Sequence, residues 1–504
     1  MRAAFPLLVL FLAHPAPADD RIVRPVRIVH PWPCAAKSTR VPASMTSAPD
    51  SFQIIATTLA TLYGTMAFGD TDHDGSGEIA LAVSTIEEFS YRVLEYNKAD
   101  RMYSQELVGP DMTPFALGDL DHDGNSEALG QLGANLLLYE SAGPDSHPTV
   151  LVWQSPAMTN IIGYSTLGDT DRDGNMEIIH SINSRGSRLA IFENTGDNAF
   201  ALKLDVKVDR FQETGPKLIA DLDQDGLLEI AFGGTNGNLH VFESPADDVW
   251  QEVFVASTGM VNAYGVTGGV DSDWNGKPEL FIAGDSIDGR LTCVYEAAGD
   301  NVFVKVAAIH TDDFVTGFTP NCMSNTDGVG QPEYVWRINH QIRAYHGAAP
   351  GQWTLSTSAN DPDANGMHTA IAAYDINQNG RDEIYWATQG NAIYGNTLVL
   401  ERPPPSPADT DTWAPLGAVT ARVRPTPCRA HATLRLADPK LQRAAFSIAA
   451  YDVSGRLVLR ERMRFSSSSD IDVPIRALRP GWYVLRVEDR VGQPVAIART
   501  VIVR

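Results

Sequence analysis

The chain has 504 residues, and its 62 Asp and Glu residues against 39 Lys and Arg residues give it a formal net charge of −23. A protein this acidic repels the phosphates of nucleic acids, so we expect no nucleic-acid partner and look for bound cations instead. Four cysteines are too few for a disulfide scaffold, and no CxxC pair or Cys/His cluster predicts a zinc site.

Residues 1–18 have the pattern of a secretory signal peptide. Arg2 gives the positive charge, Phe5 to Ala13 form an apolar segment, and Ala16-Pro17-Ala18 provide the small residues of a cleavage site. The apolar segment is shorter than the roughly 20 residues that a transmembrane helix needs. We therefore expect an exported protein with a signal peptide at 1–18 and an N-terminal extension at 19–49.

Seven copies of one motif follow between residues 50 and 402. The motif is Asp-x-Asp-x-Asp-Gly-x-x-Glu, and its copies, the last two of them weaker, start at Asp70, Asp119, Asp169, Asp221, Asp271, Asn325 and Asp375. Successive starts lie 49, 50, 52, 50, 54 and 50 residues apart. A fixed period of this size indicates a propeller, a solenoid or another repeat array.

Short strands on either side of each motif favour the propeller. An apolar strand precedes the motif, a second follows it, and a third comes after a Gly- or Asn-containing turn. In a fourth strand apolar and polar residues alternate. Four strands per repeat are typical of a propeller blade. We therefore expect an all-β fold with a seven-bladed β-propeller at 50–402. Cys293 and Cys322 fall in neighbouring blades, and the sequence leaves open whether they form a disulfide.

The two ends of the repeat region predict how the ring closes. The seventh repeat has three strands of its own, around 370–374, 383–387 and 396–401, before a proline-rich segment. Residues 52–56 form a strand-like segment ahead of the first motif and have no blade of their own. Because exposed strand edges invite aggregation, we predict that 52–56 is the outer strand of blade 7.

The motif offers the ligands of a calcium site. Carboxylates at positions 1, 3, 5 and 9 and the backbone carbonyl at position 7 are hard oxygen donors, which calcium prefers, and Gly at position 6 permits a sharp turn. These positions hold 23 acidic residues, which equals the net negative charge. We predict five or six calcium ions. The predicted metal-site residues are Asp70, Asp72, Asp74, Ser76, Glu78, Asp119, Asp121, Asp123, Asn125, Glu127, Asp169, Asp171, Asp173, Asn175, Glu177, Asp221, Asp223, Asp225, Leu227, Glu229, Asp271, Asp273, Asn275, Lys277, Glu279, Asp375, Asn377, Asn379, Arg381 and Glu383.

The last three motifs depart from the pattern. The fifth has one amide, Asn275, at a ligand position, and the seventh has two, Asn377 and Asn379, so we expect it to bind more weakly. The sixth has Val329 at position 5, which leaves open whether it binds metal. Two roles for calcium also remain open, a staple within each blade and a bridge to an acidic glycan or a partner.

The repeats resemble the FG-GAP, or VCBS, family found in integrin α-chain propellers and in many bacterial surface proteins. The resemblance spans the repeat region and rests on Asp, Asp, Asp, Gly and Glu at positions 1, 3, 5, 6 and 9, with Phe68-Gly69, Leu117-Gly118 and Leu167-Gly168 just ahead of the motif. It implies structural calcium in the turn between the first two strands of a blade. It implies nothing about the ligand, because such propellers serve many functions.

A second domain follows a Pro- and Asp-rich linker at 403–416. Residues 417–504 carry sixteen Lys and Arg against seven Asp and Glu, so the charge reverses there. Alternating strands, among them 432–436, 446–451 and 482–487, predict a small immunoglobulin-like β-sandwich.

Three segments of this domain resemble the C-terminal sorting domain of the type IX secretion system. They are 423–427, 451–458 and 478–483, with Pro425-Thr-Pro427 in place of the usual Pro-Asn-Pro. The resemblance implies type IX secretion machinery as a partner and export across the inner and outer membranes of a Gram-negative-type bacterium, so that the protein is secreted or displayed at the cell surface. The alternative is a plain immunoglobulin-like stalk.

No catalytic motif stands out, because GxSxG, HExxH and a Gly-rich phosphate loop are all missing from the sequence. We therefore expect a monomeric binding or adhesion module for a glycan or a protein, and no enzyme. The alternative is an extracellular polysaccharide lyase or hydrolase that works in the channel mouth. We expect a ligand face, if there is one, on the side of the propeller opposite the calcium loops, where the position seven residues before each motif begins the innermost strand. In four repeats this position has an aromatic ring, which can form a ligand face or simply fill the channel: Tyr63, Tyr264, Phe318 and His368.

Overall fold

The computed structural model of the chain describes residues 52–59, 65–84, 89–97, 102–143, 145–158, 164–182, 188–208, 217–311, 321–328, 331–338, 341–360, 367–389 and 396–403. In the C-terminal region it describes 421–424, 432–436, 445–451, 457–464, 470–473, 481–488 and 494–502. The expected signal peptide, the N-terminal extension, Cys34, Cys428 and residues 404–416 of the expected linker lie outside the described residues. Among the described residues no helix has the length and apolarity to cross a membrane.

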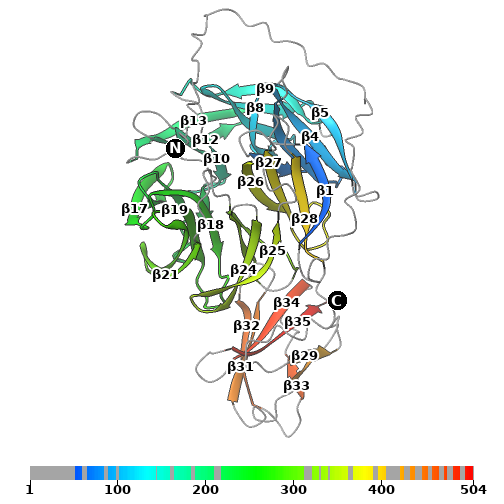
Figure 1. The fold of residues 1–504 in the computed structure, drawn as a ribbon, viewed down its shortest axis with the longest axis vertical. Helices are drawn as coiled ribbons and strands as arrows, with labels where there is room; N and C mark the ends of the chain where they lie inside the picture. Colours follow the sequence, from blue (N-terminus) through cyan, green and yellow to red (C-terminus); the bar gives the residue numbers. More distant parts are fainter. Residues whose placement is uncertain are drawn as a thin grey trace, which may run out of the picture.

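Residues 53–401 form seven four-stranded antiparallel sheets, the predicted seven blades, which follow one another around a ring in Figure 1. The strands of blades 1 to 3 are, in sheet order, β2 (Met66–Gly69), β3 (Glu78–Ser84), β4 (Phe89–Asn97) and β5 (Met102–Val108); β6 (Thr113–Gly118), β7 (Glu127–Leu132), β8 (Asn135–Ser141) and β9 (Pro148–Gln154); β10 (Ser165–Gly168), β11 (Glu177–Ile182), β12 (Arg188–Gly196) and β13 (Ala199–Lys207).

The strands of blades 4 to 6 are β14 (Leu218–Ala220), β15 (Glu229–Gly233), β16 (Asn238–Ala246) and β17 (Val249–Ser257); β18 (Asn262–Val270), β19 (Glu279–Ser286), β20 (Gly289–Gly299) and β21 (Val302–Thr311); β22 (Asn321–Ser324), β23 (Glu333–Ile338), β24 (Gln341–Ala349) and β25 (Gln352–Asn360). Blade 7 combines β26 (Met367–Tyr374), β27 (Glu383–Gln389) and β28 (Asn396–Glu401) with β1 (Gln53–Leu59).

Burial explains the strand sequences. Every residue of β11, β15 and β23 is buried, and such second strands read as nearly continuous apolar runs because neighbouring blades cover both of their faces. The fourth strands alternate and expose side chains such as Leu202 and Val255. The core lies between blades, where Ile179 and Ile191 of blade 3 pack with Phe232 and Phe242 of blade 4.

The ring closes as the sequence predicted. β1 pairs antiparallel with β28, from Gln53 opposite Glu401 to Leu59 opposite Asn396, so that both ends of the repeat region contribute to blade 7. Figure 1 shows these two strands side by side, β1 in blue and β28 in yellow. Cys293 and Cys322, in neighbouring blades, are both free thiols and form no disulfide.

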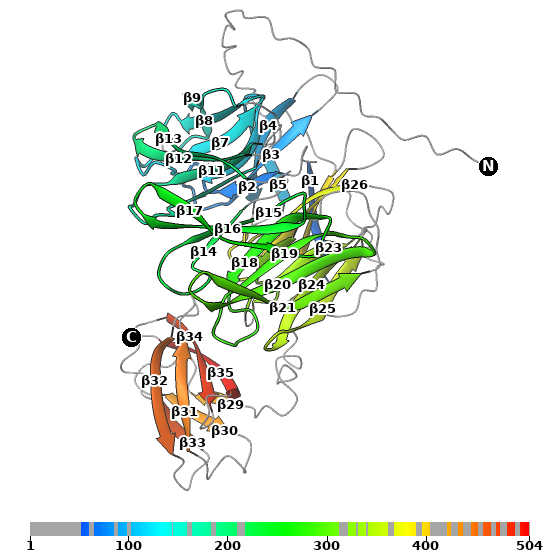
Figure 2. The ribbon, with the colours of Figure 1, turned by 90° about the vertical axis from the view of Figure 1, so that its left-hand side faces the viewer.

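The C-terminal strands form two further antiparallel sheets, drawn in orange and red in Figure 2. One has three strands, in the order β29 (Ala421–Arg424), β30 (Ala432–Leu436) and β33 (Asp470–Val473). The other has four, in the order β32 (Leu457–Arg464), β31 (Ala445–Tyr451), β34 (Gly481–Glu488) and β35 (Pro494–Ile502).

Candidate metal centres

The seven motifs form the loops between the first and second strands of the blades, which we number 1 to 7. Loop 1, for example, joins Gly69 at the end of β2 to Glu78 at the start of β3. Position 4 of each loop has a left-handed backbone, at His73, His122, Arg172, Gln224, Trp274, Gly328 and Gln378, with φ between 56° and 70°. Six of these seven are not glycine, so the sequence pattern gave no sign of this bend.

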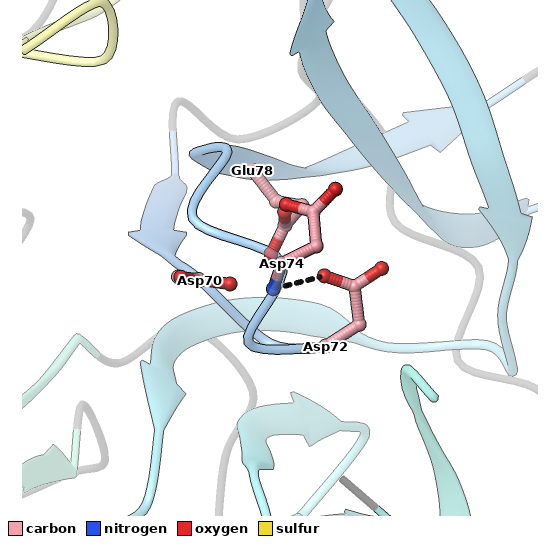
Figure 3. Close-up of side chains that lie close together, drawn as sticks. All are labelled: Asp70, Asp72, Asp74 and Glu78. Atoms are coloured by element: carbon pink, nitrogen blue, oxygen red, sulfur yellow. Dashed lines mark hydrogen bonds between the residues drawn. The ribbon is translucent and has the colours of Figure 1, made fainter. Parts of the chain in front are cut away.

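The bend brings the acidic side chains of a loop together. In loop 1 one carboxylate oxygen from each of Asp70, Asp72, Asp74 and Glu78 lies within 4.8 Å of the others, and Figure 3 shows the four side chains gathered in the loop. Loop 3 does the same with Asp169, Asp171, Asp173 and Glu177, and loop 2 with Asp119, Asp121 and Glu127. Four carboxylates this close repel one another strongly unless a cation lies between them.

The glutamate at position 9 is the most informative ligand. Its side chain is buried in all seven loops, and Oε2 accepts a hydrogen bond from the backbone N–H of position 2, for example from Leu120 to Glu127 at 2.6 Å. In loops 1 to 5 the other oxygen, Oε1, is buried without a hydrogen-bond partner, in Glu78, Glu127, Glu177, Glu229 and Glu279. A buried anionic oxygen without a partner is costly, and a bound cation would satisfy it.

Electrostatics point the same way. Burial raises the pKa of these five glutamates, to about 7 in Glu78 and Glu177, about 8 in Glu127 and Glu229 and about 9 in Glu279, although the position-2 hydrogen bond opposes the shift. Without a cation these groups tend to hold a proton near neutral pH. The donor set of loops 1 to 5 therefore fits a hard divalent ion.

Loops 6 and 7 differ from loops 1 to 5 at Oε1 of the position-9 glutamate, which has a hydrogen-bond partner in both. In loop 6 Oε1 of Glu333 accepts a hydrogen bond from Arg402 Nη1 at 2.8 Å, and in loop 7 Oε1 of Glu383 accepts one from the amide of Asn377. The seventh loop was predicted to bind metal, more weakly than the others, and here its own amide already satisfies the glutamate. Arg402 was not among the residues singled out from the sequence.

A second glutamate was also missed. On the third strand of blades 1 to 5 a glutamate lies directly opposite the position-9 glutamate, in the pairs Glu78/Glu95, Glu127/Glu140, Glu177/Glu193, Glu229/Glu243 and Glu279/Glu296. Like charges directly opposite one another destabilise a sheet. Their recurrence beside the acidic loops adds to the negative charge that a cation would neutralise.

Loops 2 to 5 also hold the next blade. The position-3 aspartate accepts a hydrogen bond from a backbone N–H in the turn between the third and fourth strands of the following blade. The four pairs are Asn198 to Asp121 at 2.6 Å, Asp248 to Asp171 at 2.9 Å, Asn301 to Asp223 at 2.7 Å and Gly351 to Asp273 at 2.6 Å. A cation bound to the position-3 carboxylate would therefore brace the junction between two blades.

Position 2 contributes to the same junctions. Where it is Thr170 or Ser272, the indole N–H of Trp250 or Trp353 in the next blade donates to its hydroxyl, at 2.9 and 3.2 Å. Where it is leucine, in loops 2 and 4, a phenylalanine of the next blade belongs to the same apolar cluster. The residue types at position 2 and on the next blade therefore change together.

Of the four rings expected on the opposite face, only Tyr264 is described with its side chain. It lies in β18 and is half-buried, and burial, with Asp285 nearby, raises the pKa of its hydroxyl. Tyr63 and Phe318 lie outside the described residues, as does the side chain of His368 in β26.

Comparison with known proteins assigns the C-terminal region. Residues 422–503 match the family model of the secretion system C-terminal sorting domain. No curated protein matches the chain. This match confirms the sorting-domain interpretation of the C-terminal segments.

Among solved structures, a protein from Lactobacillus plantarum is 10% identical and aligns over 83% of this chain and 97% of its own, with a TM-score of 0.43. An exo-β-1,3-galactanase from Phanerochaete chrysosporium, solved with β-1,3-galactotriose, is 9% identical over 84% of this chain and 92% of its own, with a TM-score of 0.30. The sorting domain identifies the protein as a type IX secretion substrate that is exported to the cell surface or secreted.

Proposed function

We propose that the protein is a binding or adhesion module whose propeller holds calcium in loops 1 to 5, and that its repeats are FG-GAP, or VCBS, repeats. The observation that carries the calcium proposal is the buried Oε1 of the position-9 glutamate, which has no hydrogen-bond partner in these five loops. Carboxylates at positions 1, 3, 5 and 9 and the carbonyl at position 7 are the hard oxygen ligands that calcium takes in flexible loops.

The contacts of the loops support a structural role for calcium. The position-3 aspartates bind the next blade in four junctions. Calcium at these loops would stabilise the ring, and would do so by binding the native state in preference to the unfolded chain. The extracellular location given by the sorting domain suits this use, because extracellular modules bind calcium at the concentrations found there.

For the remaining assignments we propose an immunoglobulin-like C-terminal domain, recognised by the type IX machinery, and a monomeric propeller with a glycan or protein ligand. A glycan and protein array, probed with the exported chain with and without calcium, would test the binding function. The same chain incubated with polysaccharides tests the alternative enzyme. New reducing ends or unsaturated sugar products would overturn the binding-module proposal.

Metal stoichiometry tests the calcium proposal. Calorimetry on the metal-stripped chain should give five sites with Kd between roughly 10⁻⁶ and 10⁻³ M. Glu229→Gln keeps an acceptor for Leu222 N–H but removes a ligand charge, so it should remove or weaken one site. Glu383→Gln is the matched control, because Asn377 already binds its Oε1, and it should leave the five sites intact. Two sites or fewer in the unmodified chain would refute the proposal.

A further inference from the structure

Blade 7 lacks a contact that blades 3 to 6 make with the preceding blade. In blades 3 to 6 the turn between the third and fourth strands donates a backbone N–H to the loop of the preceding blade. In blade 7 the third and fourth strands are β28 and β1, which come from opposite ends of the repeat region. No turn can join them, so loop 6 meets no such turn at the seam of the ring.

Arg402 lies at this seam. It directly follows Glu401, the last residue of β28, and its side chain is only 6% exposed. Nη1 of Arg402 lies 2.8 Å from Oε1 of Glu333 and 3.7 Å from Oδ2 of Asp327, whose side chains are 3% and 11% exposed. The guanidinium therefore meets positions 9 and 3 of loop 6, including the oxygen that is unpartnered in loops 1 to 5.

The charges of loop 6 suit a single positive charge. Asp327 and Glu333 are its only acidic residues at ligand positions, against four in each of loops 1 to 4, and position 5 is Val329. On the third strand His346 follows Tyr345, the partner of Tyr334, where blades 1 to 5 have a glutamate. Oε2 of Glu333 accepts hydrogen bonds from Thr326 N at 2.9 Å and Oγ1 at 2.8 Å, so Arg402 completes the partners of this carboxylate.

Blades 6 and 7 also meet through other polar contacts here. Asp382 in loop 7 accepts hydrogen bonds from Asn325 N at 2.7 Å and from Ser324 Oγ at 3.2 Å. The N–H of Asp382 donates to the carbonyl of Asn325 at 3.0 Å. The seam thus has its own set of polar contacts, with Arg402 as its buried cation.

We propose that Arg402 takes the place of a metal ion in loop 6. Its guanidinium fastens β28 of blade 7 to blade 6, whether or not metal is bound in the other loops. Loop 6 then binds no divalent ion. The comparison with a metal ion rests on the proposed calcium function of loops 1 to 5, but the fastening of the seam by Arg402 does not.

Thermal unfolding of the full chain in EDTA tests the fastening. Arg402→Met removes the charge but keeps much of the side-chain volume, and it leaves Oε1 of Glu333 buried without a partner. We expect the Tm to fall by about 4 °C or more. Adding Glu333→Gln should restore most of the loss, because the buried charge is then gone. The control is Arg188→Met, whose partner Asp205 is exposed, and its Tm should change by less than about 1 °C.

Metal titration tests the replacement. Glu333→Gln in the otherwise unmodified chain should leave the number of bound divalent ions unchanged. Arg402→Ser combined with Val329→Asp and His346→Glu should add one ion, because the loop then carries three carboxylates at ligand positions and a third-strand glutamate, as loop 5 does. Loss of an ion in Glu333→Gln would overturn the replacement, and an unchanged Tm in Arg402→Met would overturn the fastening. If the unmodified chain binds no divalent ion, the calcium function fails while the EDTA measurement still decides the role of Arg402.

Discussion

Glu229, Glu333 and Glu383 occupy the same position of three loops, yet their Oε1 atoms have three different surroundings. That of Glu229 is buried without a partner, that of Glu333 binds Arg402 and that of Glu383 binds the amide of Asn377. The motif alone does not distinguish these cases, because the difference comes from residues outside it or from an amide that serves as donor and not as ligand. A repeated glutamate therefore does not by itself mean a repeated metal site.

One buried histidine predicts how stability depends on pH. His180 in β11 is 1% exposed, its Nδ1 lies 2.9 Å from Ser165 Oγ, and burial, with Lys217 as a smaller cause, lowers its pKa to about 3. The pKa in the unfolded chain is about 6.5, so the unfolded state binds more protons between these values. Stability contributed by neutral His180 is therefore lost as the pH falls below about 6.5.

We expect the free energy of unfolding to fall by roughly 1–2 kcal/mol between pH 6.5 and 5.0 from this group alone. His180→Gln keeps an acceptor for Ser165 and cannot titrate, so the difference between the two pH values should shrink by that amount. Urea unfolding in saturating calcium, which keeps the loop carboxylates bound, measures both differences. An equal pH dependence in the variant and the unmodified chain would contradict this assignment.

At the scale of the element, the turn between the third and fourth strands shows how one substitution requires another. In blades 3 and 5 it contains Asn198 and Asn301, whose amides donate to Glu140 and Glu243 of the preceding blade, at 2.6 and 2.8 Å. Blade 4 has Asp248 there, which has no amide to donate to Glu193. Nζ of Lys203 on β13 lies between the two carboxylates, 3.0 Å from Glu193 Oε1 and 2.5 Å from Asp248 Oδ2.

Removing Lys203 should therefore destabilise the protein, and a second substitution at Asp248 should restore the stability. We expect Lys203→Met to lower the free energy of unfolding by about 1–2 kcal/mol, because Glu193 is buried and would face Asp248 without a cation. Adding Asp248→Asn should recover most of the loss, since an asparagine fills this position in two other junctions. Lys207→Met, at an exposed position of the same strand, is the control. Urea unfolding at fixed calcium measures both changes. If Asp248→Asn does not restore stability, Lys203 does not act by neutralising the pair of Glu193 and Asp248.

The elements themselves were largely predictable, whereas the contacts between them were not. The motif period gave the number of blades, and the lone segment before the first motif predicted the pairing of β1 with β28. The third-strand glutamates escaped notice because they follow position 9 by 13 to 17 residues, depending on the length of the turn between the strands. The sequence left open whether Cys293 and Cys322 form a disulfide, and the structure shows two free thiols.

At the scale of the whole molecule, sequence resemblance and structure supply different parts of the description. The three segments of the C-terminal region pointed to a sorting domain, and the family match at 422–503 confirms it. Arg402, by contrast, has no counterpart in the other repeats, because only one blade closes the ring. A feature that occurs once leaves no period in the sequence, so only the contact between Arg402 and Glu333 of loop 6 reveals it.

The last prediction concerns export. If residues 417–504 are the address read by the type IX machinery, deleting them in a host with this system should trap the propeller in the periplasm, whereas the full chain reaches the surface or the medium. Cell fractionation and surface labelling measure the outcome. Because a truncated chain that misfolds would also be retained, residues 417–504 should in parallel be fused to an unrelated periplasmic reporter, which should then appear outside the outer membrane. Surface display of the truncated propeller, or a reporter that stays in the periplasm, would show that the address lies elsewhere in the chain.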